Sequence, residues 1–567
     1  MAYYKLHAYD ADVRINGFTG LNQGEEIARD LSFALEAENV ETPRGMLQPQ
    51  AGMTLMNGEF TGKVETIARF HRRFYDGEGS NEWLVCAAGG YLYCRQANDA
   101  IGWVKIQMPE SFGTFQSNTW SWVTYEQNID GVDHPVDVII MSNKVDGMFM
   151  VIPPDRPATW GDLYLGTGDV GYTWDDIKEI IWGFSPEDNG IYSPKWQMVK
   201  VNTTVEGETV STDYRFGVIE RLKERVWAAD IMSYVTEDNE TKAIMLPDKL
   251  MYSAVYDPSD WRSYPYEEDG EMVGQPEDGA GDIDQPSWDG DRFTALKRFG
   301  DQLIALKGTK VWRVMGTGPA DFELQEQYGG GTLYPNTIAV DGERMLLVEK
   351  DGLSAYDGMA VNPFQRQAIE KTWRTINRDA MDQMCGCMFK RRYYLSVPTG
   401  TSTVNDLLIV FNTEEGSFLT YPQSYIEALM PAGDVLYATS STTPGKVYEI
   451  NYNSWETGLS TGKPIRWATP WMDFDFKSLA KGGYEIYFNP EVKGGPVTFK
   501  FSIETEKKIK TKAVMIEPTN IKAKQKRIRF GGTSRKFRLI IETMKHKPSI
   551  VWRLTGGILM VVETDPD

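Results

Sequence analysis

The sequence predicts an all-β protein: a β-propeller of about six or seven blades, followed by a C-terminal antiparallel β-sandwich. Three observations carry this prediction. Aromatic residues make up 12% of the chain, which also contains 53 glycines and 28 prolines, a composition typical of short strands joined by tight turns. A strand–turn–strand pattern returns at the spacing of propeller blades. The C-terminal part alternates between apolar and polar residues, as strands with one buried face do.

The chain divides into three parts. Its length of 567 residues indicates more than one domain, because single hydrophobic cores stop growing at about 250–300 residues. We assign 1–54 to an N-terminal segment, 55–455 to the propeller and 456–567 to the sandwich. The sequence from 25 to 53 lacks the blade pattern. Because a propeller must close its ring, the N-terminal segment is a candidate for the closing strand.

The blade pattern consists of a short apolar strand, a tight polar turn, a second strand and a third strand led by glycine. Equivalent positions in the first strands are Leu296, Val340, Met388 and Leu429. Successive units are therefore 44, 48 and 41 residues apart. An earlier unit begins near Arg221, 75 residues before Leu296, and must contain an insertion. We place it at 257–291, which holds 12 acidic residues and one arginine. A flat array of β-sandwiches is the competing interpretation.

Alternating segments predict the strands of the C-terminal sandwich: 484–488, 497–503, 526–530, 537–541 and 557–562. Charge separates this part from the rest. Residues 461–567 contain 21 basic and 11 acidic residues, a net charge of +10, whereas residues 1–460 contain 38 and 69, a net charge of −31. We expect the basic side chains on an exposed face and in loops: Lys507, Lys508, Lys510, Lys512, Lys522, Lys524, Lys526, Arg527 and Arg529.

This basic face has two interpretations. The favoured one is a solvated surface, or a surface that docks onto an acidic protein. The alternative is nucleic-acid binding, but few aromatic residues interleave with these charges to stack on bases.

The sequence offers no catalytic constellation. The four histidines, His7, His71, His134 and His546, lack the spacing of metal ligands, and phosphate-binding or nucleophile motifs are missing. We therefore assign no catalytic, cofactor-binding or metal-binding residue, expect no cofactor, and expect the protein not to be an enzyme. Cys86, Cys94, Cys385 and Cys387 are interpreted as reduced, buried thiols, with Cys385–Cys387 in an apolar strand rather than a metal knuckle. No apolar stretch reaches the ~18 residues that span a bilayer, so we expect no membrane insertion.

Three features have a functional and a structural interpretation. Thr167–Trp174 matches the Asp box of sialidase-like propellers, but a single copy is more readily a turn. Asp282, Asp284, Asp289 and Asp291 offer oxygens to a hard cation, but the segment lacks EF-hand spacing, and a solvated loop or an inter-subunit contact is favoured. Trp120, Trp122, Trp467 and Trp471 are candidates for stacking on sugars, although core packing is the favoured role.

Short motifs near both ends carry a resemblance. They are Asn16-Gly17, Gly20-Leu21-Asn22, Ala37-Glu38-Asn39, Gly45–Gly52 and Trp467–Phe474 followed by Lys477. Together with the blades between them, they resemble the β-propeller structural proteins of tailed-bacteriophage tails, the head-completion (stabilisation) and tail-nozzle proteins below the portal. In such proteins the fourth motif tends to read Gly-x-Leu-x-x-Arg-x-Gly, and Gln50 here departs from the arginine.

The resemblance implies a virion protein of the tail or connector, synthesised in the host cytoplasm. It implies a ring of commonly six copies that extends the DNA channel, contacts portal, adaptor or other tail proteins, and lets DNA pass without tight binding. The acidic body fits this expectation, because a wall that neutralises phosphates would hold the DNA. The alternatives are a glycan-binding or glycan-cleaving (sialidase-like) propeller of the tail and a cellular propeller scaffold.

Overall fold

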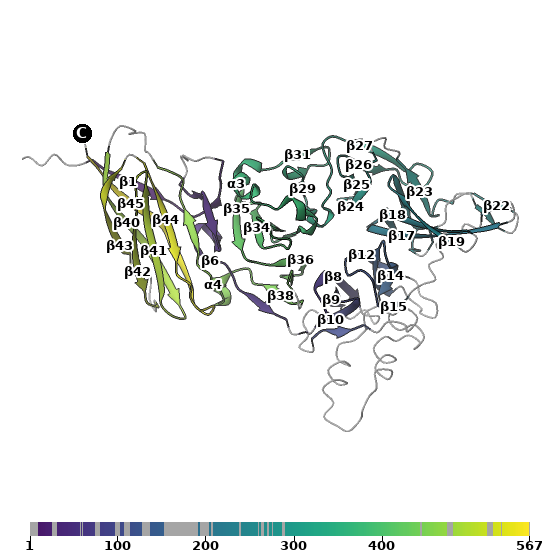
Figure 1. Cartoon of the computed structure of the whole chain (residues 1–567), viewed down its shortest axis with the longest axis horizontal. Coiled ribbons are helices and arrows are strands. Elements are labelled where there is room, and N and C mark those ends of the chain that lie inside the picture. Colours follow the sequence, from purple (N-terminus) through teal and green to yellow (C-terminus); the bar gives the residue numbers. More distant parts are fainter. Residues whose placement is uncertain are drawn as a thin grey trace, which may run out of the picture.

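We describe the fold from a computed structural model. It describes residues 9–24, 31–56, 58, 60–73, 80–96, 102–106, 114–127, 136–151, 191–192, 203–205, 208–237, 240–258, 260–261, 266–268, 271–274, 276–285, 290–442, 445–472, 480–518, 525–534 and 536–565. Within these ranges the protein consists of a seven-bladed propeller with a two-sheet sandwich beside it (Figure 1). The predicted fold class is confirmed, and the flat array of sandwiches is not what forms.

Each blade is a small antiparallel sheet, in which the first strand lies innermost in six blades and the second strand lies innermost in blade three. Blades one and two contain β8 (Val64–Arg73), β9 (Ser80–Ala88), β10 (Tyr91–Gln96), β11 (Val104–Lys105), then β12 (Ser121–Gln127), β13 (Val136–Asn143), β14 (Gly147–Val151), β15 (Ile191–Tyr192). Blade three contains β16 (Thr203–Val205), β17 (Glu208–Leu222), β18 (Arg225–Glu237), β19 (Glu240–Leu246), β20 (Lys249–Tyr252), β23 (Gly281–Asp284). Blade four contains β24 (Phe293–Phe299), β25 (Gln302–Lys307), β26 (Val311–Met315), β27 (Glu323–Gln327).

The remaining blades follow the same order. Blade five contains β28 (Ala339–Val340), β29 (Met345–Glu349), β30 (Gly352–Tyr356), β31 (Val361–Pro363). Blade six contains β32 (Cys385–Phe389), β33 (Arg392–Val397), β34 (Leu407–Asn412), β35 (Ser417–Pro422). Blade seven contains β36 (Ile426–Ala432), β37 (Val435–Ser440), β38 (Val447–Ile450) and, from the N-terminal segment, β7 (Met53–Leu55). The four repeat positions found in the sequence lie in β24, β28, β32 and β36, the innermost strands of four consecutive blades.

The N-terminal segment contributes strands both to the propeller and to the sandwich. Its strand β7 completes blade seven, with Met53 opposite Ile450 and Leu55 opposite Tyr448. Strand β1 (Tyr9–Ile15) instead pairs with the C-terminal strand β45 (Val551–Asp565) and belongs to the sandwich. A division at residue 54 therefore does not match the path of the chain.

Two facing sheets form the sandwich. One has the order β1–β45–β40–β43, with β40 at Ala480–Lys493 and β43 at Lys526–Ser534. The other contains β39 (Arg466–Ala468), β44 (Phe537–Thr543), β41 (Val497–Thr505) and β42 (Ile509–Ile516). Aromatic rings fill the space between them: Phe499 lies 4.9 Å from Trp552 and Phe488 lies 4.5 Å from Phe501, centroid to centroid. All five segments predicted from alternation lie in these strands.

The sandwich is continuous with the propeller. Strand β4 (Glu36–Glu38) pairs in parallel with β35, the outer strand of blade six, and antiparallel with β39 of the sandwich. The blade-six sheet thereby runs into the sandwich as one 11-stranded sheet, and one hydrophobic core extends across both. Backbone pairing and a shared core therefore connect the two parts.

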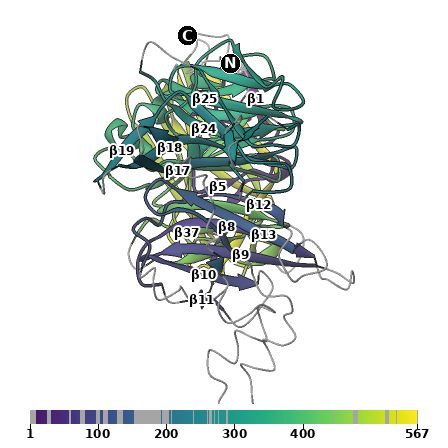
Figure 2. The ribbon, with the colours of Figure 1, turned by 90° about the vertical axis from the view of Figure 1, so that its right-hand side faces the viewer.

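Blade three carries the insertion. Strands β17 and β18 are 15 and 13 residues long and extend past the blade, where β19 pairs with β18 at the edge of the molecule (Figure 2). The hairpin β21 (Tyr266–Glu268) and β22 (Glu271–Val273) lies within the acidic range 257–291, but β23 in the same range is the outer strand of the blade.

Short elements complete the described chain: β2 (Gly20–Leu21), β3 (Phe33–Ala34), β5 (Val40–Glu41), β6 (Gln48–Pro49), α3 (Glu370–Trp373), α4 (Ser454–Thr457) and 3-10 turns at Pro43–Gly45, Pro335–Thr337, Arg366–Ile369 and Arg378–Gln383. Across the described ranges, no helix has the length and apolar character needed to cross a bilayer.

Candidate functional site

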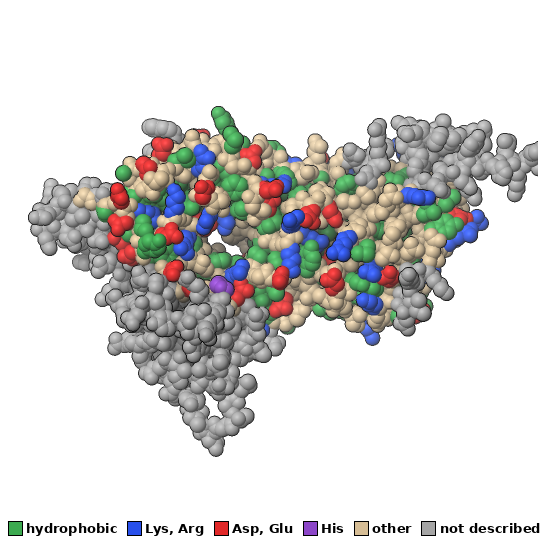
Figure 3. Space-filling model, turned by 180° about the vertical axis from the view of Figure 1, so that it is seen from behind, with side chains coloured by type: hydrophobic (Ala, Val, Ile, Leu, Met, Phe, Trp, Pro, Cys, Tyr) green, Lys and Arg blue, Asp and Glu red, His purple; other side chains and the backbone are tan. Residues whose placement is uncertain are grey.

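The central channel of the propeller is a large hollow in the described structure. Its wall includes residues of all seven innermost strands, and it encloses about 1140 Å³. Seen along the ring axis, the hollow lies in the middle of the propeller, with basic and acidic side chains around it (Figure 3). Ligands usually bind in concave hollows of a protein, and this channel is therefore a candidate binding site.

The channel wall carries mixed charge rather than the acidic charge of the body as a whole. Its basic side chains are Arg69, Arg221, Lys223, Arg292, Lys297 and Arg298. Its acidic side chains are Glu220, Glu224, Asp230 and Asp301. The negative charge of residues 1–460 therefore lies elsewhere on the surface.

Most of these charges compensate one another. Glu220 lies 3.5 Å from Lys297 Nζ, and its oxygens accept hydrogen bonds from the backbone N–H groups of Arg221 and Arg298. This carboxylate ties the innermost strand of blade three to that of blade four. This pairing is a structural contact between the two blades.

Asp230 makes a second contact of the same kind. Its Oδ2 lies 2.7 Å from Lys144 Nζ of blade two, and its Oδ1 lies 3.7 Å from Arg292 of blade four. Asp230 has a positive φ of 54°, and opposite it stands Gly217, where a Cβ would come within 2.4 Å of Asp230 Oδ2. The glycine leaves the space that this carboxylate occupies between three blades.

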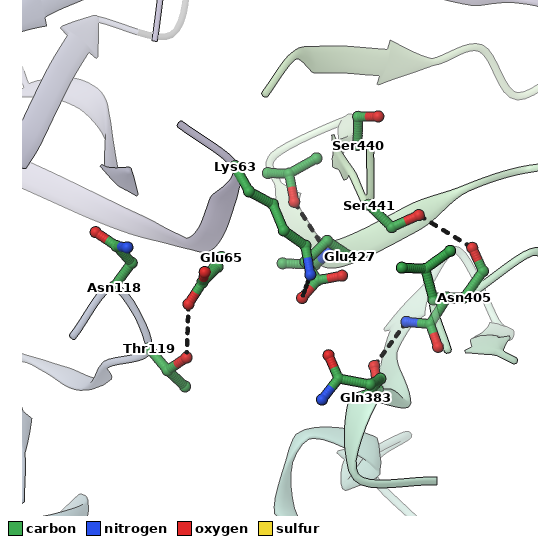
Figure 4. Close-up of polar contacts among 12 residues, drawn as sticks. Lys63, Glu65, Asn118, Thr119, Gln383, Asn405, Glu427, Ser440 and Ser441 are labelled. Atoms are coloured by element: carbon green, nitrogen blue, oxygen red, sulfur yellow. Dashed lines mark hydrogen bonds and ion pairs between the residues drawn. The ribbon is translucent and has the colours of Figure 1, made fainter. Parts of the chain in front are cut away.

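Polar contacts link blade one to blades seven and two, and blade six to blade seven (Figure 4). Lys63 Nζ lies 2.7 Å from Glu427 Oε1, and Thr119 donates a hydrogen bond to Glu65 over 3.2 Å. Asn405 donates to the carbonyl of Ile426, 2.9 Å away. Burial raises the pKa of Glu427, while the Lys63 ammonium opposes the rise. These contacts join neighbouring blades around the ring.

The cysteines lie where the sequence places them, in strands. All four are buried and free, and Cys385 and Cys387 belong to β32. Burial raises the pKa of the Cys86 thiol well above its ordinary value and that of Cys94 to about 12. Thiols with such pKa values are poor nucleophiles at neutral pH.

Asp282 and Asp284, two of the four aspartates predicted as candidate cation ligands, already pair with a lysine. The ammonium of Lys249 lies 2.5 Å from Asp282 and 3.3 Å from Asp284, in the place a cation would take. Asp291 accepts hydrogen bonds from the backbone N–H groups of Gly308 and Thr309. Asp289 lies outside the described residues. Among the described residues, no group of three or more His, Cys, Asp or Glu side chains is arranged to hold a metal ion.

The four tryptophans considered for sugar stacking differ in their burial. Trp120 and Trp467 are buried and pack against Phe115 and Phe18, so neither presents a face to a sugar. Trp122 is half-buried in the channel wall, and Trp471 is half-buried with the Arg538 guanidinium over its ring. The Asp-box segment 167–174, His7 and His134 lie outside the described residues.

Sequence reasoning did not find the channel wall. Its residues come from seven strands spread between Arg69 and Pro431, and no local motif connects them. The available signal is the repeat itself, because the innermost strand of every blade must line the axis.

No protein-family model and no curated protein matches the sequence. Solved structures with some similarity include the WD40 domain of Neurospora crassa Pan2, at 9% identity and a TM-score of 0.29, covering 69% of this chain and 90% of that one. The β-propeller domain of the Trilobed protease from Pyrococcus furiosus is 6% identical, with a TM-score of 0.26, and covers 71% and 95%. An exo-β-1,3-galactanase from Phanerochaete chrysosporium is 7% identical, with a TM-score of 0.22, and covers 90% and 99%.

Proposed function

We propose that this protein is a structural component of a bacteriophage tail or head–tail junction. It assembles as a ring or nozzle, with six copies the expected number, and extends the channel through which DNA leaves the particle. It docks neighbouring tail proteins and catalyses no reaction. The proposal is supported by the resemblance of the terminal motifs and, above all, by one structural feature, the sheet that runs from blade six into the sandwich.

A continuous sheet suits a part that must withstand force. Hinged domains are joined by exposed linkers that few contacts cross, whereas here the strands β35, β4 and β39 carry backbone hydrogen bonds across the junction. The N- and C-terminal strands β1 and β45 also pair with each other, so both ends of the described chain lie in one sheet. Such a block transmits force without changing shape.

Charge supports the same role. A net charge of −31 on residues 1–460 repels DNA, and the net +10 on residues 461–567 attracts an acidic neighbour. Because the wall of the propeller's own channel is of mixed charge, we assign DNA passage to the lumen formed between copies and not to that channel.

Two experiments test the function. Mass spectrometry and antibody labelling of purified phage particles are expected to find the chain at the tail or connector. Filter binding at physiological salt is expected to show no tight complex with duplex DNA. Absence from particles, or a salt-sensitive micromolar complex with DNA, would contradict the proposal.

The glycan alternative is tested separately. A glycan array and a sialidase-substrate screen on the purified chain are expected to give no signal. Binding that is lost on substituting Trp122, the half-buried tryptophan of the channel wall, would favour the alternative.

A further inference from the structure

The sandwich ends in an open edge strand. In the described part of the chain β42 pairs only with β41, so its other edge presents unpaired backbone groups. Ile509 and Met515 of this strand are 58% and 61% exposed, and Lys508 and Lys512 are exposed beside them. An edge that is apolar, basic and unpaired is a template for a further strand of opposite charge.

Blade four ends in an open edge of the opposite charge. Among the described strands β27 pairs only with β26, and it contains Glu323 and Glu326 but no lysine or arginine. It continues directly into Tyr328, which is 84% exposed. With five residues, β27 is longer than the outer strands β11, β15, β23, β31 and β7 of the other blades. Strand β19, at the edge of the blade-three extension, has seven residues but contains Lys242.

The chain already joins a blade to the sandwich in this manner. The outer strand β35 of blade six continues through β4 into the sandwich sheet that ends at β42. The 11-stranded sheet therefore has blade six at one end and the open, basic edge of β42 at the other end. Adding the acidic edge of another blade repeats a contact that the fold itself uses.

We infer that β42 of one copy pairs edge to edge with β27 of a second copy, so that the basic edge with Lys508 and Lys512 meets the acidic edge with Glu323 and Glu326. This inference rests on the proposed ring assembly and names its interface. In this pairing the exposed side chains of Ile509 and Met515 in one copy lie near the exposed Tyr328 of the other copy. Main-chain hydrogen bonds supply affinity, and the opposite charges select the partner edge.

The geometry favours a ring over a symmetric dimer. The two edges lie on different parts of the molecule, β42 on the far side of the sandwich and β27 on the propeller (Figure 1). Contact between two different surfaces of the same chain is heterologous, and it builds a closed ring when the rotation between copies closes.

Paired charge reversals on the full-length chain test the interface. One variant carries Lys508→Glu and Lys512→Glu, and the other carries Glu323→Lys and Glu326→Lys. Sedimentation velocity is expected to show self-association at least ten-fold weaker for each variant alone. An equimolar mixture is expected to recover assembly, because every contact between unlike copies again joins opposite charges. Lys545→Glu with Lys547→Glu, which makes the same charge change at exposed positions outside β42, is expected to assemble as the original chain does.

Three results overturn the inference. Rings that form equally well from either reversed variant show that another surface is the interface, and the proposed ring function then stands without it. Reversed variants that weaken assembly but do not complement each other show that β27 is not the partner of β42. An original chain that stays monomeric removes the interface, while the search of phage particles for the protein decides the function independently.

Discussion

Arg466 Nη1 lies 2.6 Å from Glu542 Oε1 on the neighbouring strand, and the same guanidinium binds Glu36 of β4. Arg538 also contacts Glu36, at 3.1 Å, and Glu504, at 2.6 Å. These ion pairs cross the strands that join propeller to sandwich. Although burial favours the neutral acid, the hydrogen bonds and charges of Arg466 and Arg538 hold the pKa of Glu36 below its ordinary value.

Replacing Arg466 with leucine is expected to loosen this junction. The substitution leaves Glu36 and Glu542 without their shared partner, at a cost of about 1–2 kcal/mol for half-buried groups. Urea unfolding followed by tryptophan fluorescence is the measurement. Arg374→Leu, at an exposed pair with Glu370, is the control and is expected to change stability by less than about 0.5 kcal/mol. Equal effects of the two substitutions would contradict a structural role for the network.

Glu41 gives the fold a pH dependence. Burial raises its pKa to about 7, against the opposing charge of Arg392 and hydrogen bonds from Ala51, Gln48 and Ser454. A carboxyl group with a raised folded-state pKa stabilises the fold fully below its unfolded pKa of about 4.5, and this contribution is lost as the pH rises through 7.

Glutamine cannot ionise, so Glu41→Gln removes this dependence. The free energy of unfolding of the original chain, relative to the variant, is expected to fall by about 2–3 kcal/mol between pH 5 and pH 8. Denaturant unfolding at both pH values measures it. Glu343→Gln, at an exposed turn, is the control and is expected to keep a constant difference. A constant difference for Glu41→Gln as well would show that Glu41 titrates in its ordinary range.

Arg225 anchors the acidic range to blade three. It is buried and donates hydrogen bonds to the carbonyls of Ser253, Glu277 and Gly279 at 2.8, 2.9 and 2.6 Å. Arg225→Lys retains the charge but lacks the guanidinium fork, and is expected to cost about 1–3 kcal/mol. Limited proteolysis is expected to cut near 276–280 faster in the variant. Unchanged cleavage there would show that the loop is held by other contacts.

Gly217 is required by its neighbour. Alanine there would place a Cβ 2.4 Å from Asp230 Oδ2 and push this carboxylate from Lys144, at a cost of about 1–3 kcal/mol. Gly274→Ala is the matched control, because a Cβ at that glycine meets nothing within 4 Å. Thermal unfolding of both variants is the measurement, and a melting temperature for Gly217→Ala equal to that of the control would contradict this account of the Asp230–Lys144 contact.

Local sequence patterns were sufficient to predict the blades and most sandwich strands. The alternation and the turn glycines are properties of adjacent residues, and they recur wherever a blade begins. Strand β1 was not foreseen as part of the sandwich, because its partner residues 558–564 lie at the other end of the chain. No local signal shows a pairing over that separation.

Strand β42 was missed for a different reason. Its lysines at 510 and 512 indicated an exposed face or loop, and the sequence does not show that Ile509–Ile516 pairs with Val497–Glu504. The mixed charge of the channel was also invisible, because the acidic average of residues 1–460 does not show which strands face the axis. Whether a strand lies at a sheet edge or faces a channel depends on its neighbours in the folded structure. The sequence alone therefore predicted neither β42 nor the channel wall.

Negative-stain imaging of the purified full-length chain, at rising concentration, tests the central claim most directly. The account predicts rings with a central opening, built from identical copies with the sandwich of one against the propeller of the next. Particles that remain single propellers with one attached sandwich at every concentration would contradict it.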